Sequence, residues 1–143
     1  MEIIKLFVQY FPSFMDALVF TLELTALSLL IASLIGIIFG LFSVSNNKIL
    51  IGITRLYVDI IRGTPLLVQA FLIYFGISQA LGVRIPAMTA GVITLSINAG
   101  AYMTEIVRGG IEAVDKGQME AARSLGLPYG KAMVKIILPQ ALR

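Results

Sequence analysis

Apolar and charged positions separate along this chain into long apolar blocks and short polar interruptions. Residues 24–45 contain no charged side chain. A helix of that length, at about 1.5 Å per residue, crosses the ~30 Å hydrocarbon core of a bilayer. We expect this span to begin near Ala17, which places Glu23 inside it or at its edge. Residues 1–13 mix charged and apolar side chains and predict a short interfacial helix that ends near Pro12.

Small residues recur every four positions within this first span, at Ala32, Gly36 and Gly40. On a helix this spacing forms a ridge along one face, and such ridges let two helix backbones approach closely. The ridge favours packing against another helix of the same chain. Contact with a second copy is the alternative.

A second apolar block, residues 49–81, is interrupted by Asp59, Arg62, Gly63, Thr64 and Pro65. Thr64 followed by Pro65 is typical of a helix N-cap and a first-turn proline. The sequence therefore predicts a helix to about Arg62, a break, and a second helix through Ala80. Asp59 and Arg62 lie three residues apart and can pair on one helix face. Alternatively, Arg62 extends its guanidinium toward the lipid headgroups.

The third apolar block begins at Ile85 and extends to about Met103, and its second half is unusually polar. Thr94, Asn98 and Tyr102 recur every four residues, which places them roughly on one helix face. Glu105 follows three residues later. Polar groups are costly in hydrocarbon unless they face protein or water. The stripe therefore either lines a polar pathway or forms hydrogen bonds between helices, and Glu105 is either solvated or paired with Arg108.

Composition supports a membrane protein and excludes several kinds of site. Of the 143 residues, 58% are hydrophobic and 13% are charged, and the mean hydropathy is +0.93. The charged fraction is far below the ~25% of soluble domains. The absence of cysteine and histidine excludes disulfides, thiolate metal sites and the usual proton shuttle near neutral pH. A proton- or sodium-coupled carrier is therefore weakly supported. The net charge of +3 indicates loop charges and does not indicate nucleic-acid binding.

The distribution of basic residues predicts the orientation. The first turn carries Lys48 and Arg55, and six further basic residues follow the third block: Arg108, Lys116, Arg123, Lys131, Lys135 and Arg143. Lys5 and Arg84 are the basic residues of the N-terminus and the second turn. Because cytoplasmic loops carry more lysine and arginine, the first turn and the C-terminal segment are predicted to be cytoplasmic and the N-terminus outside.

The segment after the third block is polar and predicts a helical hairpin. Asp115 is a plausible N-cap, and Gln118 three residues later approximates a capping box. A short helix to Leu125 is followed by Gly126 as a left-handed stop and by Pro128 as the start of a second helix. That second helix should run to about Leu138, where Pro139 ends it. Its amphipathic face should lie on the inner membrane surface: Tyr129, Met133, Ile136 and Ile137. From these features alone, a simple linker is an equal alternative.

Three stretches resemble a known family. Glu120-Ala121-Ala122, then Gly126, Ile136 and Leu138-Pro139 resemble the EAA signature of ABC importer permeases. The run RGTPLLVQ at residues 62–69 resembles the polar amino acid permease subfamily, of glutamine, arginine and histidine type. So do residues 98–110 and 117–121. The resemblance covers most of the chain from about Ala17 onward.

The resemblance implies an all-α polytopic transmembrane helix bundle with the type I ABC importer permease fold. It implies one permease domain, residues 1–143, containing a cytoplasmic EAA coupling loop at residues 112–139. Three spans and the coupling hairpin are present, and the last two of the five spans usual in the subfamily are expected to be missing. The coupling residues that it implies are Glu120, Ala121, Ala122, Arg123, Ser124, Leu125 and Gly126.

The implied function is import of a polar amino acid, such as glutamine, glutamate, arginine, histidine or cystine, into a prokaryotic cytoplasm across the plasma (inner) membrane. The implied partners are a cytosolic ABC ATPase dimer, a second permease copy (the same or different) and an extracytoplasmic substrate-binding protein. No GxxxxGK[ST] phosphate loop is present, so ATP and Mg are expected on the ATPase, and this chain is expected to bind no cofactor or metal and to catalyse no reaction. The candidate substrate-pathway residues are Gln69, Thr94, Asn98, Tyr102 and Glu105. A membrane anchor or regulatory fragment that moves no solute is the alternative.

Overall fold

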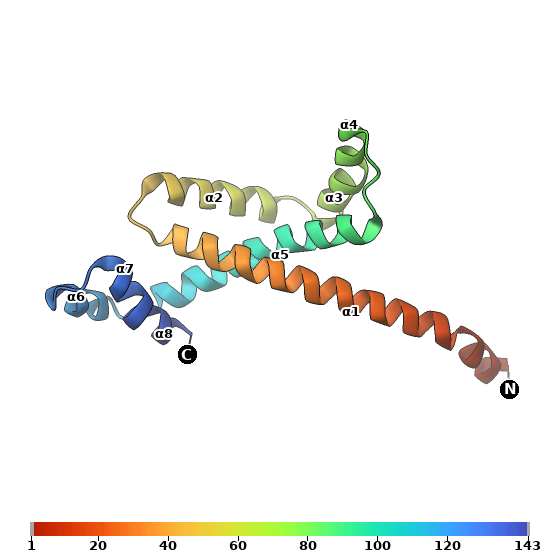
Figure 1. Ribbon diagram of the computed structural model, residues 1–143, viewed down its shortest axis with the longest axis horizontal. Helices are drawn as coiled ribbons and strands as arrows, with labels where there is room; N and C mark the ends of the chain where they lie inside the picture. The colour runs from red at the N-terminus through yellow and green to blue at the C-terminus, as the bar shows by residue number, and fades with distance from the viewer. Residues whose placement is uncertain (1, 143) are drawn as a thin grey trace.

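The computed structural model describes residues 2–142, and all regular structure in that range is helical (Figure 1). Two long helices, α1 (Glu2–Ser43) and α5 (Ala87–Glu112), cross each other, and α2 (Lys48–Gly63) lies along one side of α5. A shorter arm follows α2: α3 (Leu66–Phe71), the π-helical segment η1 (Leu72–Ile77) and α4 (Ser78–Leu81). The C-terminal hairpin contains α6 (Lys116–Ser124), α7 (Tyr129–Ala132), the π-helical segment η2 (Met133–Ile137) and α8 (Leu138–Ala141).

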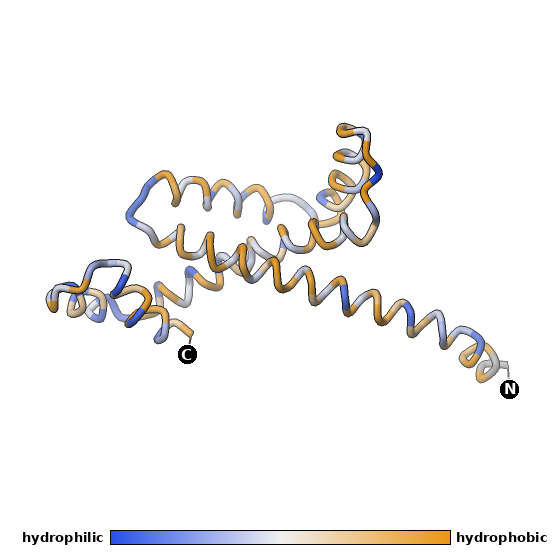
Figure 2. The backbone as a smooth tube through the Cα atoms, viewed as in Figure 1, coloured by the Kyte–Doolittle hydropathy of each residue, from blue (hydrophilic) through white to orange (hydrophobic). Residues whose placement is uncertain are grey.

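Helix α1 runs without interruption through Pro12, so the predicted end of a separate interfacial helix near that residue is wrong. Proline removes one backbone donor and crowds the preceding turn, which bends a helix. In an apolar helix the other backbone groups have no better partners than one another, so the helix continues. Glu23 was predicted either inside the first span or at its edge, and it lies inside α1. Apolar colour dominates α1 in Figure 2, whereas the α1–α2 turn and the hairpin are more hydrophilic.

Within the described residues, two helices are long and apolar enough to cross a membrane: Leu6–Ser43 and Ala87–Glu112. The second predicted span, residues 49–81, is broken, because α2 and the α3–α4 arm meet at an angle of 101°. The break lies between Gly63 and Leu66, where it was predicted. Thr64 does not cap α3, however. The following Pro65 holds Thr64 in an extended backbone conformation. The Thr64 hydroxyl instead donates to the Ile60 carbonyl at 2.8 Å.

The small-residue ridge of α1 packs against α5 within the same chain. Ala32 is completely buried. A Cβ atom added at Gly36 would overlap Met103, and one added at Gly40 would overlap Val107. On the opposing face, a Cβ added at Gly100 would lie 2.7 Å from a methyl carbon of Ile35. The packing interpretation of the ridge is therefore confirmed.

The hairpin follows the predicted caps. Asp115 Oδ1 accepts the backbone N–H of Gly117 at 2.8 Å. Gly126 has a φ of +82°, the left-handed conformation expected at a helix stop. The second half of the capping box is absent among the described hydrogen bonds, because the side-chain oxygen of Gln118 accepts from Gln140 at 3.4 Å.

The second helix of the hairpin differs from its prediction in two respects. It continues through Pro139 to Ala141. Proline has no backbone N–H and cannot donate to the carbonyl four residues earlier. The preceding turn, η2, is π-helical, and its wider winding does not use that hydrogen bond, so the helix can continue through Pro139. The apolar face also does not form a free membrane-facing surface. Met133 and Ile137 are buried in a cluster with Ile111 of α5.

Candidate functional site

Gln69 and Asn98 form a polar junction where the broken span meets α5. The Gln69 side chain is 7% exposed. Its Nε2 donates to the carbonyls of Ile61 at 2.7 Å and Thr64 at 2.9 Å. Its Oε1 accepts from Asn98 Nδ2 at 3.3 Å. The amide of Gln69 therefore bonds two carbonyls at the end of α2, of which that of Ile61 also accepts the Thr64 N–H at 3.4 Å, and it joins this end to α5.

The polar stripe of α5 does not lie in a single cavity. Thr94 is 3% exposed and donates its hydroxyl to the Ala90 carbonyl at 2.7 Å. It lines an apolar cavity of about 330 Å³ beside Phe71 of α3. Glu105, at the other end of the stripe, lines a polar cleft of about 380 Å³ between α2 and α5. Asn98 lies between them and is partly exposed, and its bond to Gln69 of α3 confirms for this residue the hydrogen bonding between helices.

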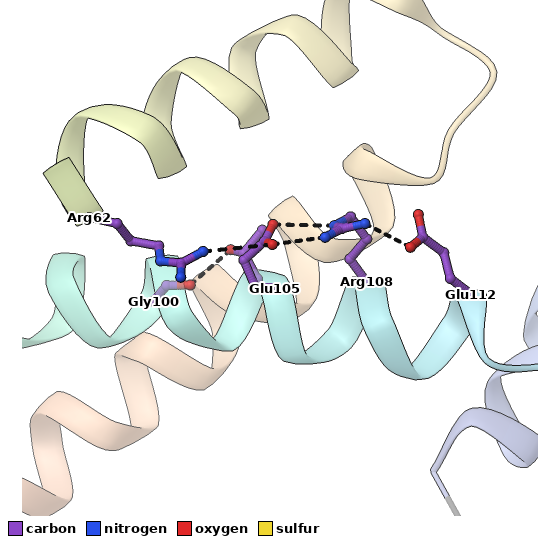
Figure 3. Close-up of polar contacts among 6 residues, drawn as sticks. Arg62, Gly100, Glu105, Arg108 and Glu112 are labelled. Atoms are coloured by element: carbon purple, nitrogen blue, oxygen red, sulfur yellow. Dashed lines mark hydrogen bonds and ion pairs between the residues drawn. The ribbon is translucent and has the colours of Figure 1, made fainter.

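A series of ion pairs follows the cleft along α5 (Figure 3). Arg108 forms a two-bond pair with Glu105, at 2.8 and 3.2 Å, and contacts Glu112 at 2.7 Å. Arg62 of α2 approaches the same Glu105 at 3.7 Å, and its guanidinium lies 5.2 Å from the ring centre of Tyr102. The Glu105–Arg108 pairing was one of the two predicted alternatives.

The predicted pair between Asp59 and Arg62 is wrong. Within residues 2–142 Asp59 forms no ion pair, and Arg62 pairs across the cleft with Glu105. Arg62 lies in the last turn of α2, which packs along α5, and a carboxylate and an aromatic ring of α5 are both within its reach. Sequence reasoning also missed Arg55 and Glu112 as cleft residues. Only the amphipathic pattern of α2 could have indicated that Arg55, Asp59 and Arg62 lie on one side.

The tip of the hairpin presents most of the predicted coupling residues at the surface. Leu125 is 83% exposed, although it is a large apolar side chain. Exposed with it are Glu120, Ala121, Arg123, Ser124 and Gly126. Ala122 differs because it is 1% exposed and lies inside the hairpin. Arg123 donates to the Leu127 carbonyl at 3.1 Å, which closes the turn at the tip.

The hairpin is attached firmly to the two long helices. The cluster of Ile111, Met133 and Ile137 joins α5 to η2. The hydroxyl of Tyr129 donates to the carbonyl of Val44, just after α1, at 2.9 Å. A groove of about 710 Å³ remains between these elements. No group of acidic side chains in the described part of the chain is arranged to hold a metal ion.

Comparison with known proteins gives consistent matches. Residues 32–143 match the family described as binding-protein-dependent transport system inner membrane component. The arginine transport system permease protein ArtQ of Bacillus subtilis is 43% identical over 132 residues, covering 92% of this chain and 60% of ArtQ. The nopaline transport system permease protein NocM of Agrobacterium fabrum is 40% identical, with coverage of 98% and 62%.

A solved structure matches as well. The crystal structure of an amino acid ABC transporter with histidines superposes with a TM-score of 0.84 at 49% identity, covering 94% of this chain and 63% of that one. This likeness gives the helices the type I ABC importer permease fold. The chain spans about three fifths of the length of these relatives.

Proposed function

Because the chain belongs to the binding-protein-dependent transport system inner membrane component family, we propose that it is the transmembrane permease subunit of an ATP-driven importer of polar amino acids. The match over residues 32–143 carries this proposal, because it includes the end of α1 that packs on α5, the broken span, α5 itself and the hairpin. The relatives described above are permease proteins for arginine and nopaline, which supports a polar amino acid or a derivative as the solute.

The driving reaction in this proposal takes place on other chains. The sequence contains no phosphate loop, so a cytosolic ATPase dimer would bind ATP and Mg and hydrolyse the nucleotide. A second permease copy would complete the pathway, and an extracytoplasmic binding protein would deliver the solute. The permease itself would lie in the inner membrane with its N-terminus outside and the hairpin in the cytoplasm, as the basic residues predict.

The hairpin tip is the proposed contact with the ATPase. An apolar side chain as exposed as Leu125 is costly at a free surface and is typical of an anchor that a partner covers. Glu120 and Arg123 supply polar groups beside it. Ala122 is buried within the hairpin, so we assign it to the packing of the tip and not to direct contact.

Reconstitution tests the proposed function. The protein, with its ATPase and binding protein, would be incorporated into lipid vesicles, and uptake of radiolabelled arginine or glutamine would be followed with and without ATP. We expect uptake that requires ATP, Mg and the binding protein. Uptake without ATP would contradict the proposal. Assembly with the ATPase but no uptake of either solute would favour the anchor or regulatory alternative.

The docking contact is tested by Leu125→Asp, which places a charge in the proposed anchor. We expect loss of ATPase binding by about tenfold or more, because hot-spot side chains contribute at least about 2 kcal/mol. Leu142→Asp is the matched control, since Leu142 is 87% exposed and lies outside the tip. Co-purification and ATPase stimulation are the measurements. Equal effects of the two substitutions would contradict the assigned role of Leu125.

A further inference from the structure

The bonding of Gln69 is fixed by the chemistry of its partners. Nε2 faces the backbone carbonyls of Ile61 and Thr64. Carbonyl oxygens only accept hydrogen bonds, so the NH₂ group of Gln69 must point toward them. A rotation of the amide by half a turn would place oxygen against two carbonyl oxygens and lose both of these hydrogen bonds. Gln69 therefore has one allowed amide orientation.

This orientation determines the orientation of Asn98. The remaining oxygen of Gln69 can only accept, so Asn98 must turn its NH₂ group toward it, as the 3.3 Å contact shows. The Oδ1 atom of Asn98 is left over. No side chain or backbone group in residues 2–142 donates to it. It is also not enclosed, because the enclosed side-chain atoms without partners in the described residues are the hydroxyl oxygens of Ser28 and Thr54.

Two other members of the stripe on α5, Thr94 and Glu105, also present oxygen atoms. Thr94, one turn before Asn98, has already used its hydroxyl proton on the Ala90 carbonyl. Glu105, about two turns beyond Asn98, is a carboxylate whose charge is balanced by Arg108 and Arg62. Both groups offer oxygen lone pairs.

We propose that Gln69 is a positioning residue that fixes the Asn98 amide with its carbonyl oxygen toward the solute. This position then takes a hydrogen-bond donor of the solute, such as an ammonium, amide or guanidinium group, and disfavours a carboxylate. The inference rests on the permease function proposed above, because it requires a solute to reach α5. It adds that Asn98 accepts a hydrogen bond from the solute, which membership of the family does not specify.

The fixed orientation is tested by a double-mutant cycle on thermal unfolding of the purified chain in lipid nanodiscs. Asn98→Asp and Asn98→Ala would each be made with Gln69 present and with Gln69→Leu. If Gln69 is fixed, Asn98→Asp places oxygen against oxygen and lowers Tm more than Asn98→Ala does, by about 3 °C or more. The difference should shrink in the Gln69→Leu background. The cost of placing a carboxylate at this site is common to both backgrounds and cancels.

The opposite result is equally clear. If Gln69 could turn over, its NH₂ group would donate to the new carboxylate. The Tm of Asn98→Asp, measured relative to that of Asn98→Ala, would then be higher when Gln69 is present than in the Gln69→Leu background. This result would overturn the positioning role. If Gln69→Leu fails to fold, Gln69→Met, which keeps an unbranched side chain, serves as the second background.

The polarity toward solute is tested by competition against radiolabelled L-glutamine bound to the same preparation. L-glutamate replaces the side-chain amide with a carboxylate, and N-acetyl-L-glutamine removes the ammonium group. At least one of them should compete about tenfold more weakly than unlabelled L-glutamine, the value of one hydrogen bond. Asn98→Ala should remove that difference.

Three results would overturn the assignment of Asn98: equal competition by both analogues, discrimination that persists in Asn98→Ala, or no saturable binding of L-glutamine. Failure of the proposed transport function would appear elsewhere, as absence of ATP-driven uptake by the reconstituted complex. The unfolding cycle does not depend on uptake, so the two failures are distinguishable.

Discussion

Helix α5 packs against α1 and α2 by two different kinds of contact. Toward α1 it presents small residues, and the backbones approach until a single added methyl group at Gly36 would collide with Met103. Toward α2 it presents a polar cleft, and the polar contacts described between the two helices are one hydrogen bond, from Tyr57 to the Ile97 carbonyl, and one ion pair, between Arg62 and Glu105. The first contact is set by shape and excludes water, whereas the second is set by polar partners that water can replace.

The difference indicates which helix can move. Separating α1 from α5 would open a void or expose backbone to lipid. Separating α2 from α5 would exchange protein hydrogen bonds for bonds to water, at a much smaller cost. We therefore treat α1 and α5 as a fixed pair and α2 as the adjustable element. The following predictions test that division.

The largest effect is expected from Gly36→Ala. The added Cβ would overlap Met103, and overpacking of this kind costs about 1–3 kcal/mol. Gly52→Ala on α2 is the matched control, because a Cβ there meets no described atom within 4 Å. The control should be neutral or slightly stabilising, by up to ~1 kcal/mol. Thermal unfolding in nanodiscs would measure both, and equal shifts would show that the α1–α5 contact is not close-packed.

An intermediate effect is expected from Tyr57→Phe. Tyr57 joins α2 to α5 through a 2.7 Å hydrogen bond to the Ile97 carbonyl, and its ring lies 4.7 Å from that of Phe39 on α1. Removing the hydroxyl keeps the ring contact and should cost about 1 kcal/mol. Tyr74→Phe is the control, because the Tyr74 hydroxyl has no hydrogen-bond partner among the described residues. Hydrogen exchange of α2 amides should increase in the first variant only.

The smallest effect is expected from Arg62→Gln. The pair with Glu105 is long, at 3.7 Å, and Arg62 is 44% exposed, so water and salt screen it. We expect a loss below about 1 kcal/mol. The change should be larger at low salt, measured by unfolding at two NaCl concentrations. Arg84→Gln, in the loop before α5 and without an ion pair in residues 2–142, is the control. A large, salt-independent loss would mean that α2 is as firmly fixed as α1.

Local signals in the sequence were sufficient for most of the helical elements. A membrane helix must satisfy its own backbone groups, so the apolar blocks define the spans, and Asp115 and Gly126 define the hairpin by their own conformations. Pro12 and Pro139 were misjudged because a proline ends a helix only if the freed groups find other partners. Here the helix continues in both cases.

The site was less predictable because its contacts join elements distant in sequence. The four-residue spacing identified Asn98, and the family motif identified Gln69, but no local pattern pairs the two. For Arg62 the sequence offered a pair with Asp59, three residues away on the same helix, or extension toward the lipid headgroups, and neither alternative included Glu105. The contact between Arg62 and Glu105 depends on how α2 packs along α5, which no local pattern specifies.

The bond between Tyr129 and the Val44 carbonyl gives the hairpin a mechanical property. Together with the cluster at Ile111, it attaches the hairpin to both members of the α1–α5 pair at the same end. A force applied at the exposed tip near Leu125 is therefore carried by two long helices in parallel. The close-packed pair would tilt as one body, and the displacement would grow with distance along the helices. The relative motion this produces would occur at the polar contact with α2.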